Sequence, residues 1–163
     1  MMKSQKIHPR PESENALELA LRYLTHRPRS VYEMRVYLSK KGFNEEISSL
    51  TVELLLEKKY LDDEIFTRSF VESRKNYKPK SKFALAYELQ KKGVESAVIE
   101  DVLKEYNDQD LALKALSSKI QLWAHLDCEK FKKKILNFLK YRGFNHEISV
   151  SLLNRIKQSD QET

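Results

Sequence analysis

The chain has 163 residues, of which 40% are hydrophobic and 33% are charged, so it is long and apolar enough to build a hydrophobic core. Its 30 Lys and Arg residues exceed its 24 Asp and Glu residues, and the resulting net charge of +6 mildly favours an anionic partner. The three glycines are too few and too widely spaced for a phosphate-binding loop, which excludes the common nucleotide-hydrolysing motifs.

The cysteine count and the hydropathy pattern indicate a cellular compartment. Cys128 is the single cysteine, so no intramolecular disulfide can form, as is usual for proteins of a reducing compartment. No apolar run reaches the roughly 18 residues of a membrane span, and the first residues lack the apolar centre of a signal peptide. We therefore expect a cytoplasmic protein without membrane association.

The glycines mark a repeat of about 50 residues. Gly42, Gly93 and Gly143 are separated by 51 and 50 residues, and each follows a basic residue and precedes an apolar one. Apolar residues recur at offsets of −8, −4, +1, +5 and +10 from each glycine. They are Met34, Leu38, Phe43, Ile47 and Val52, then Leu85, Leu89, Val94, Val98 and Leu103, then Ile135, Leu139, Phe144, Ile148 and Leu153. This periodicity predicts a tandem array of one supersecondary unit.

Helix signals divide the first repeat into three helices. Leu17, Ala20, Leu21 and Leu24 follow the i, i+3, i+4, i+7 spacing of an amphipathic helix. The second helix is expected to open with a capping box and to end at the glycine, and the third to open at an asparagine N-cap. The capping residues are Ser30 and Glu33, then Asn44, with Asn145 at the position equivalent to Asn44 in the third repeat.

Nine helices are expected in all, with almost no sheet. Their predicted ranges are 13–26, 30–41 and 44–59, then 63–76, 81–92 and 95–105, then 109–125, 128–142 and 145–157. The predicted organisation is a flexible N-terminal tail (1–12), three-helix repeats at 13–62, 63–107 and 108–157, and a C-terminal tail (158–163). A single repeat is too small to bury its apolar faces, so stacking should produce an all-α, elongated and curved array.

Neither a catalytic nor a metal site is indicated. His125 and Cys128 are only two of the ligands that a structural zinc site needs, and a partly buried pair beside an aromatic ring is the simpler interpretation. Asp62 and Asp63 are better explained as an N-cap and a carboxylate that complements the helix dipole, with Asp108 and Asp110 as the same cap in the next repeat. We expect no cofactor, no metal and no enzymatic activity.

The positive charge is concentrated in the second repeat. Residues 67–92 contain eight basic and two acidic side chains, which equals the net charge of the whole chain. Such a surface can bind phosphates or an acidic protein face, although it can equally be a solubilising helix face. Tyr77 can stack on a base or pack against its own helices. The candidate residues for binding are Arg68, Arg74, Lys75, Tyr77, Lys78, Lys80, Lys82, Lys91 and Lys92.

A second basic cluster lies in the third repeat, where residues 129–142 contain one acidic side chain, Glu129. Its basic members are Lys130, Lys132, Lys133, Lys134, Lys140 and Arg142.

The chain resembles the RecX family over roughly residues 14–157. The resemblance rests on the segments ALELALRYLTHRPRS, YEMRVYLSKKGF, YLDDEIFTRSFVESR, YELQKKGV and FLKYRGF. It implies a monomeric regulator that binds RecA and RecA–single-stranded DNA filaments along their groove. Family members mainly restrain filament growth and the ATPase, strand-exchange and coprotease activities of RecA in DNA repair and the SOS response. Multivalent contact with adjacent filament subunits suits a repeat array, with weak, salt-sensitive nucleic-acid binding beside it.

Two other classes of protein remain open. Three-helix units with a glycine-containing turn also form helix-turn-helix proteins, which would bind duplex DNA directly. A general helical-repeat scaffold is the third class, although the period of about 50 residues exceeds the 34 to 47 typical of such repeats.

Overall fold

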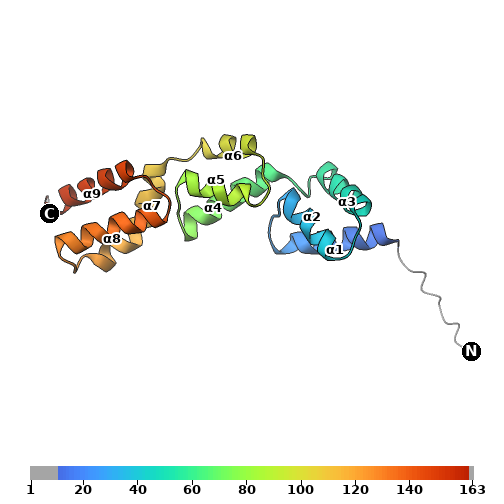
Figure 1. The fold of residues 1–163 in the computed structure, drawn as a ribbon, viewed down its shortest axis with the longest axis horizontal. Helices are drawn as coiled ribbons and strands as arrows, with labels where there is room; N and C mark the ends of the chain where they lie inside the picture. Colours follow the sequence, from blue (N-terminus) through green and yellow to red (C-terminus); the bar gives the residue numbers. More distant parts are fainter. Residues whose placement is uncertain (1–10, 162–163) are drawn as a thin grey trace, which may run out of the picture. The chain divides into compact units, whose positions relative to one another are not determined.

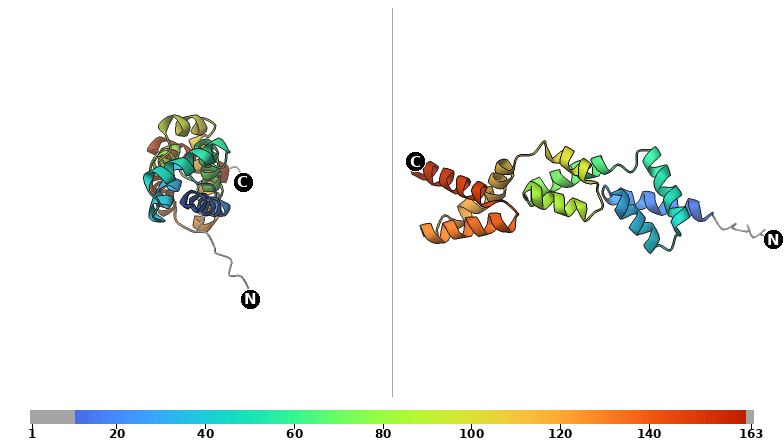
Figure 2. Two further views of the ribbon diagram at one scale, coloured as in Figure 1. Left: turned by 90° about the vertical axis from the view of Figure 1, so that its right-hand side faces the viewer. Right: turned by 45° about the horizontal axis from the view of Figure 1, so that its top comes forward.

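The structure is a computed structural model that describes residues 11–161, and every regular element in that range is an α-helix (Figure 1). The helices are α1 (Glu12–His26), α2 (Val31–Lys40), α3 (Glu45–Glu57), α4 (Asp63–Tyr77), α5 (Lys82–Gln90), α6 (Ser96–Leu103), α7 (Asp108–Trp123), α8 (Cys128–Tyr141) and α9 (His146–Gln161). Each consecutive group of three forms one repeat, and Figure 2 shows the same groups from two further sides. The predicted all-helical fold of three-helix repeats is confirmed.

The observed helix ends lie within two residues of the predicted ones in every case except the last. Helix α9 continues to Gln161, through most of the segment expected to be a C-terminal tail, and residues 162 and 163 lie outside the described range. At the other end, α1 begins at Glu12, and residues 1–10 of the expected N-terminal tail are likewise outside it.

The glycines end the second helix of each repeat in a left-handed conformation. Gly42, Gly93 and Gly143 have φ angles of +94°, +75° and +88°. In the first repeat the backbone N–H of Gly42 donates to Ser39 O at 3.0 Å, and that of Phe43 donates to Leu38 O at 3.3 Å. The other two glycines show the same pair of hydrogen bonds. This Schellman arrangement brings together the residues at offsets −4 and +1, which explains why both are apolar in every repeat.

The predicted helix N-caps are present. Ser30 and Glu33 form a reciprocal capping box at the start of α2. The side-chain oxygens of Asn44 and Asn145 accept from the backbone N–H of Ile47 at 2.9 Å and of Ile148 at 2.8 Å. These bonds satisfy N–H groups that have no partner within the helix.

The chain divides into two compact units, Met1–Phe66 and Thr67–Thr163, with the boundary inside α4. In the first unit the core comprises Ala16, Ala20, Met34, Leu38, Val52, Leu55 and Leu61. Residues at offsets −8, −4 and +10 from the glycine are buried in all three repeats. Leu21, which was expected on the buried face of α1, is 36% exposed because that face is centred on the small residues Ala16 and Ala20.

Aspartates at the start of one repeat cap a helix of the preceding repeat. Asp63, the first residue of α4, accepts from the backbone N–H of Val31 at the start of α2 at 2.8 Å. Asp108, the first residue of α7, accepts from the N–H of Lys82 at the start of α5 at 2.7 Å. Asp62 is the N-cap of α4, as predicted.

The prediction that Asp108 is the N-cap of α7 is wrong. Asn107 occupies that position and accepts from Gln109 N–H at 2.7 Å. The carboxylate of Asp108 is therefore available to the neighbouring repeat, where it compensates the partial positive charge of a helix N-terminus.

Candidate functional site

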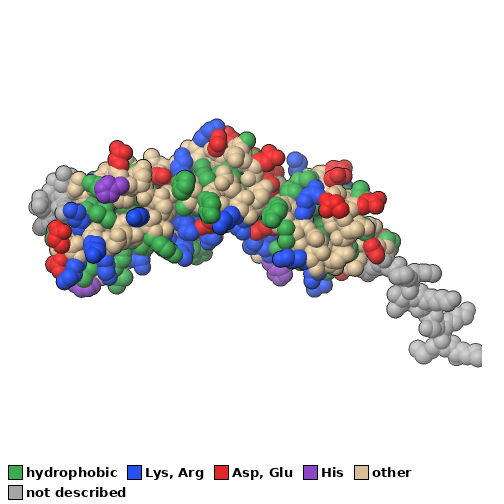
Figure 3. Space-filling view, in the orientation of Figure 1, with side chains coloured by type: hydrophobic (Ala, Val, Ile, Leu, Met, Phe, Trp, Pro, Cys, Tyr) green, Lys and Arg blue, Asp and Glu red, His purple; other side chains and the backbone are tan. Residues whose placement is uncertain are grey.

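The nine candidate residues lie on α4, the loop after it, α5 and the glycine turn that follows, all within the second compact unit. In Figure 3, Lys and Arg side chains gather along the lower margin of the part formed by α4 and α5. The structure separates these residues into a group held by carboxylates and a group facing solvent.

Glu88 on α5 holds two of the candidates. Its Oε2 accepts from Arg74 Nε at 2.9 Å, and its Oε1 accepts from Lys80 Nζ. Burial acts to raise the pKa of Glu88, but the hydrogen bonds from Lys80 and Arg74 outweigh it and hold the pKa below its ordinary value. Arg74 and Lys80 thus join α4, the loop and α5.

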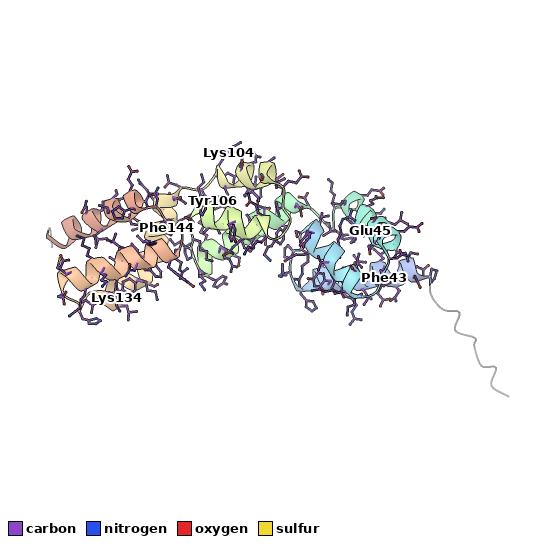
Figure 4. The ribbon with its side chains drawn as sticks, in the orientation of Figure 1. Phe43, Glu45, Lys104, Tyr106, Lys134 and Phe144 are labelled. Carbon is purple, nitrogen blue, oxygen red and sulfur yellow. The ribbon has the colours of Figure 1, made fainter. Side chains whose placement is uncertain are left out.

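Two further cations pair with acidic residues, one with Glu105 in the turn before α7 and one with Glu72 of α4 itself. Arg68 Nη1 lies 2.8 Å from both carboxylate oxygens of Glu105, and Lys75 Nζ lies 3.3 Å from Glu72 Oε1. The hydroxyl of Tyr106, labelled in Figure 4, donates to the same Glu72 oxygen at 2.7 Å. Burial and this hydrogen bond raise the pKa of Tyr106 to about 12, while the bond lowers the pKa of Glu72.

The first repeat shows that the ion pairs of Glu88 with Arg74 and Lys80 occupy a position at which the first repeat also joins its helices by side-chain contacts. The repeat length is 51 residues, so Tyr23, Tyr37 and Arg29 of the first repeat are at positions equivalent to those of Arg74, Glu88 and Lys80 in the second. In the first repeat the rings of Tyr23 and Tyr37 stack at 4.0 Å, and Arg29 lies 3.8 Å from the centre of the Tyr23 ring. An aromatic–cation stack in one repeat is therefore replaced by an ion-pair cluster in the next.

The solvent-facing candidates are Tyr77, Lys78, Lys82 and Lys91. Tyr77 is 88% exposed, so the interpretation that it packs against its own helices is wrong. Lys78 is exposed, Lys82 is half-buried, and neither forms an ion pair with any acidic residue in the range described. Lys91 is exposed and lies 4.4 Å from the centre of the Tyr87 ring.

The remaining candidate, Lys92, is half-buried and lies 5.7 Å from the Phe70 ring. The basic residue before each of the other glycines also lies over a ring: Lys41 over Tyr37 at 5.6 Å, and Arg142 over Phe138 at 4.9 Å. The basic residue before the glycine thus lies over an aromatic ring in all three repeats, and this contact does not distinguish the second repeat from the others.

Two exposed aromatic residues extend this surface and were missed from the sequence. Phe83 is 78% exposed and Tyr87 is 54% exposed. Their spacing was an available signal, because positions 83 and 87 lie on one face of α5, away from the buried Leu85 and Leu89.

The third repeat fixes the loop that carries Lys78 and Lys80. Arg142 Nη1 donates to Pro79 O at 3.1 Å, and the backbone N–H of Ser81 donates to Arg142 O at 3.1 Å. Phe144 lies at the end of α8 nearest to α5 (Figure 4). The geometry of the candidate surface therefore depends on the neighbouring repeat.

Residues 11–161 contain no group of three or more His, Cys, Asp or Glu side chains that could hold a metal ion. His125 and Cys128 are both exposed, so the interpretation that they are partly buried is wrong. None of the described helices is long and apolar enough to cross a lipid bilayer.

Two family models match the chain in order. Residues 16–55 match the first three-helix domain of RecX, and residues 62–103 match the second. The second match contains all nine candidate residues.

Curated relatives extend the similarity to the third repeat. Regulatory protein RecX of Chlorobium limicola is 30% identical over 147 residues, which cover 90% of this chain and 92% of the relative. Regulatory protein RecX of Lactobacillus johnsonii is 30% identical over 97% of this chain, but the chain spans only 59% of that longer relative. The crystal structure of RecX from Lactobacillus salivarius has the same fold, with a TM-score of 0.77, 21% identity, and coverage of 90% of this chain and 97% of that one. This chain belongs to the RecX family.

Proposed function

We propose that this chain binds RecA and RecA–single-stranded DNA filaments along the filament groove. It mainly inhibits filament growth, ATPase, strand exchange and coprotease activity, and so acts in DNA repair and the SOS response. It acts as a cytoplasmic monomer without catalytic activity or a cofactor. The observation that carries the proposal is the match of both RecX three-helix domains in order, with every candidate binding residue in the second.

The contact surface is the solvent-facing part of the candidate group, formed by Tyr77, Lys78, Lys82 and Lys91 with Phe83 beside them. Aromatic rings are enriched at protein interfaces because they contribute a large buried area at low entropic cost, and exposed lysines attract an acidic or phosphate-bearing partner electrostatically. Carboxylates engage Arg68, Arg74, Lys75 and Lys80. The pairs of Arg74 and Lys80 with Glu88 join α4, the loop and α5, and the pair of Arg68 with Glu105 joins α4 to the turn before α7.

The test is RecA ATPase on single-stranded DNA with this protein added below the RecA concentration. Suppression at low ratios indicates blocked filament growth. Replacing Lys78, Lys82 and Lys91 together with Glu should raise the concentration needed for half-inhibition by at least tenfold. The matched control replaces Lys40, Lys58 and Lys104, exposed residues that change the net charge equally, and should inhibit like the parent protein.

Circular dichroism of each variant verifies that helicity is retained. If the parent protein leaves the ATPase unchanged at every ratio, the proposed function is wrong. Unaltered inhibition by the Lys78, Lys82 and Lys91 variant would instead refute the contact surface.

The helix-turn-helix alternative is tested by titration against bare duplex, bare single strand and RecA-coated single strand. RecA-coated strand should bind most tightly, and binding to the two bare forms should weaken steeply as salt rises. Tight, sequence-selective binding to bare duplex would favour the alternative.

A further inference from the structure

We propose that the third repeat carries a groove for single-stranded nucleic acid, formed by the outward face of α8 and the start of α9. The inference goes beyond the proposed action on RecA and does not depend on it. All of its residues lie outside the candidate surface of α4 and α5.

Two neighbouring hollows form the groove. The first has a volume of about 390 Å³, the second has a volume of about 460 Å³, and Leu136 and Asn137 line both. The first is also lined by Glu129, Lys130, Lys132 and Lys133, and the second by Lys140, Phe144, His146 and Ser149. Ten residues separate Lys130 from Lys140, so the groove follows α8 for roughly 15 Å at the helical rise. Lysines line it at intervals, with apolar side chains between them.

The positive charge of this groove is less compensated than that of the second repeat. Lys130 pairs with Asp127 at 2.8 Å, and Lys134, labelled in Figure 4, lines neither hollow and lies 5.6 Å from the Trp123 ring. Lys132, Lys133 and Lys140 are exposed and have no carboxylate partner within the described part of the chain. By contrast, carboxylates hold Arg68, Arg74, Lys75 and Lys80 in the second repeat.

Close lysines on one helix repel each other. Lys130 and Lys133, which both line the first hollow, are three residues apart and therefore neighbours on the helix surface, where like charges destabilise a helix by a few tenths of a kcal/mol. An anion that spans several of these lysines relieves the repulsion, and a nucleic-acid backbone supplies regularly spaced phosphates.

The side chains between and beside the lysines favour nucleic acid over an acidic protein face. Tyr141 is 81% exposed and lies four residues after Asn137, on the same side of α8. An exposed ring can stack on a base, and an exposed amide can both donate to and accept from a base edge. These contacts require unpaired bases, as does the apolar surface of the half-buried Leu136, so a single strand fits better than a duplex.

The test uses the full chain and a fluorescein-labelled 20-nucleotide oligo(dT), with binding followed by anisotropy at several salt concentrations. Replacing Lys132, Lys133 and Lys140 together with Glu should weaken binding at least tenfold. It should also reduce the slope of log affinity against log salt by about 2, because each phosphate contact on a single strand contributes roughly 0.7. Replacement of Lys40, Lys58 and Lys104 with Glu, which changes the net charge equally, should weaken binding less than threefold.

Tyr141→Ala tests the stacking contact separately. Since base stacking on a ring contributes about 1–3 kcal/mol, this variant should weaken oligo(dT) binding about fivefold or more. The salt slope should stay unchanged, because no charge is removed.

Four outcomes would overturn the proposal. They are no measurable binding of oligo(dT), equal weakening by the two lysine variants, equally tight binding of a 20-base-pair duplex, and binding of polyglutamate in place of oligo(dT). The last outcome would assign the groove to an acidic protein face. Because RecA ATPase inhibition is measured with different variants, a negative result here leaves the proposed function standing.

Discussion

Gly143 lies so close to Ser81 that a side chain has no room: a Cβ atom added to the glycine would be 2.7 Å from Ser81 Oγ. The same atom would be 2.8 Å from Ala84 Cβ. This glycine therefore has two functions, since it ends α8 with a φ of +88° and also packs the third repeat against the start of α5. Gly42 has a similar φ of +94°, but no atom would lie within 4 Å of its added Cβ.

Substitution of the two glycines should separate backbone strain from steric conflict. Gly42→Ala is expected to lower the free energy of unfolding by about 1 kcal/mol, the cost of a left-handed alanine. Gly143→Ala should lower it by roughly 3 kcal/mol, because overpacking adds to the same strain. Urea denaturation followed by circular dichroism measures both, and equal losses would show that the contact with Ser81 is unimportant.

Asp108→Ala should destabilise the start of α5, which lies in the preceding repeat. The substitution removes the 2.7 Å hydrogen bond to Lys82 N–H, and loss of such a cap typically costs about 1 kcal/mol. Hydrogen exchange of the α5 amides should accelerate along with those of α7. Asp110→Ala is the matched control, because Asp110 is an exposed carboxylate in the first turn of α7. Faster exchange confined to α7 would contradict the capping role across repeats.

Glu88→Gln should destabilise the protein by roughly 1–2 kcal/mol at neutral pH, because Arg74 and Lys80 lose a charged hydrogen-bond acceptor. The pKa of Glu88 is depressed, so its stabilising effect is present above its ordinary pKa of 4.5 and is lost as pH falls through the lower folded value. The difference between parent and variant should therefore disappear in strong acid.

Urea denaturation at neutral pH and near pH 3 measures this difference. Glu100→Gln on the exposed face of α6 is the control and should change stability little at either pH. A destabilisation by Glu88→Gln that persists undiminished in acid would show that charge is not its cause.

The hydroxyl of Tyr106 should titrate about two pH units higher than that of an ordinary tyrosine. Its pKa is raised from 10.0 to about 12, so its stabilising effect is complete below pH 10 and is lost as pH rises through about 12. The difference in absorbance at alkaline pH between the parent protein and Tyr106→Phe isolates this group from the other tyrosines. Glu72→Gln removes the carboxylate that accepts the hydrogen bond from the Tyr106 hydroxyl and should lower the pKa of Tyr106. A Tyr106 transition near pH 10 in the parent would contradict the hydrogen bond.

Local signals in the sequence predicted the helices well because each signal acts within a few residues. The glycine stops, the capping box of Ser30 and Glu33, and the N-cap of Asn44 are all made by neighbours in the chain. Leu21 and α9 show the limits of this reasoning. Exposure of Leu21 depends on how closely two alanines let α1 approach its neighbours, and α9 continues past its last buried leucine, Leu153.

The binding surface was predicted less completely, because charge counts take no account of distant partners. The sequence shows eight basic residues against two acidic ones in 67–92, but Glu105 lies outside that window and pairs with Arg68. Glu88 lies inside it and engages two cations at once. Which lysines remain available to a partner therefore follows from the packing of α4 against α5 and α7.

The amino-acid sequence alone was sufficient for the repeat length, the boundaries of α1 to α8 to within two residues, and the family, since these depend on periodicity and on contacts between near neighbours. Folding in three dimensions decided which charges are neutralised, which aromatic rings reach solvent, and how Asp108 and Arg142 connect adjacent repeats. These features join residues 26 to 63 positions apart, and no local pattern in the chain encodes such distances.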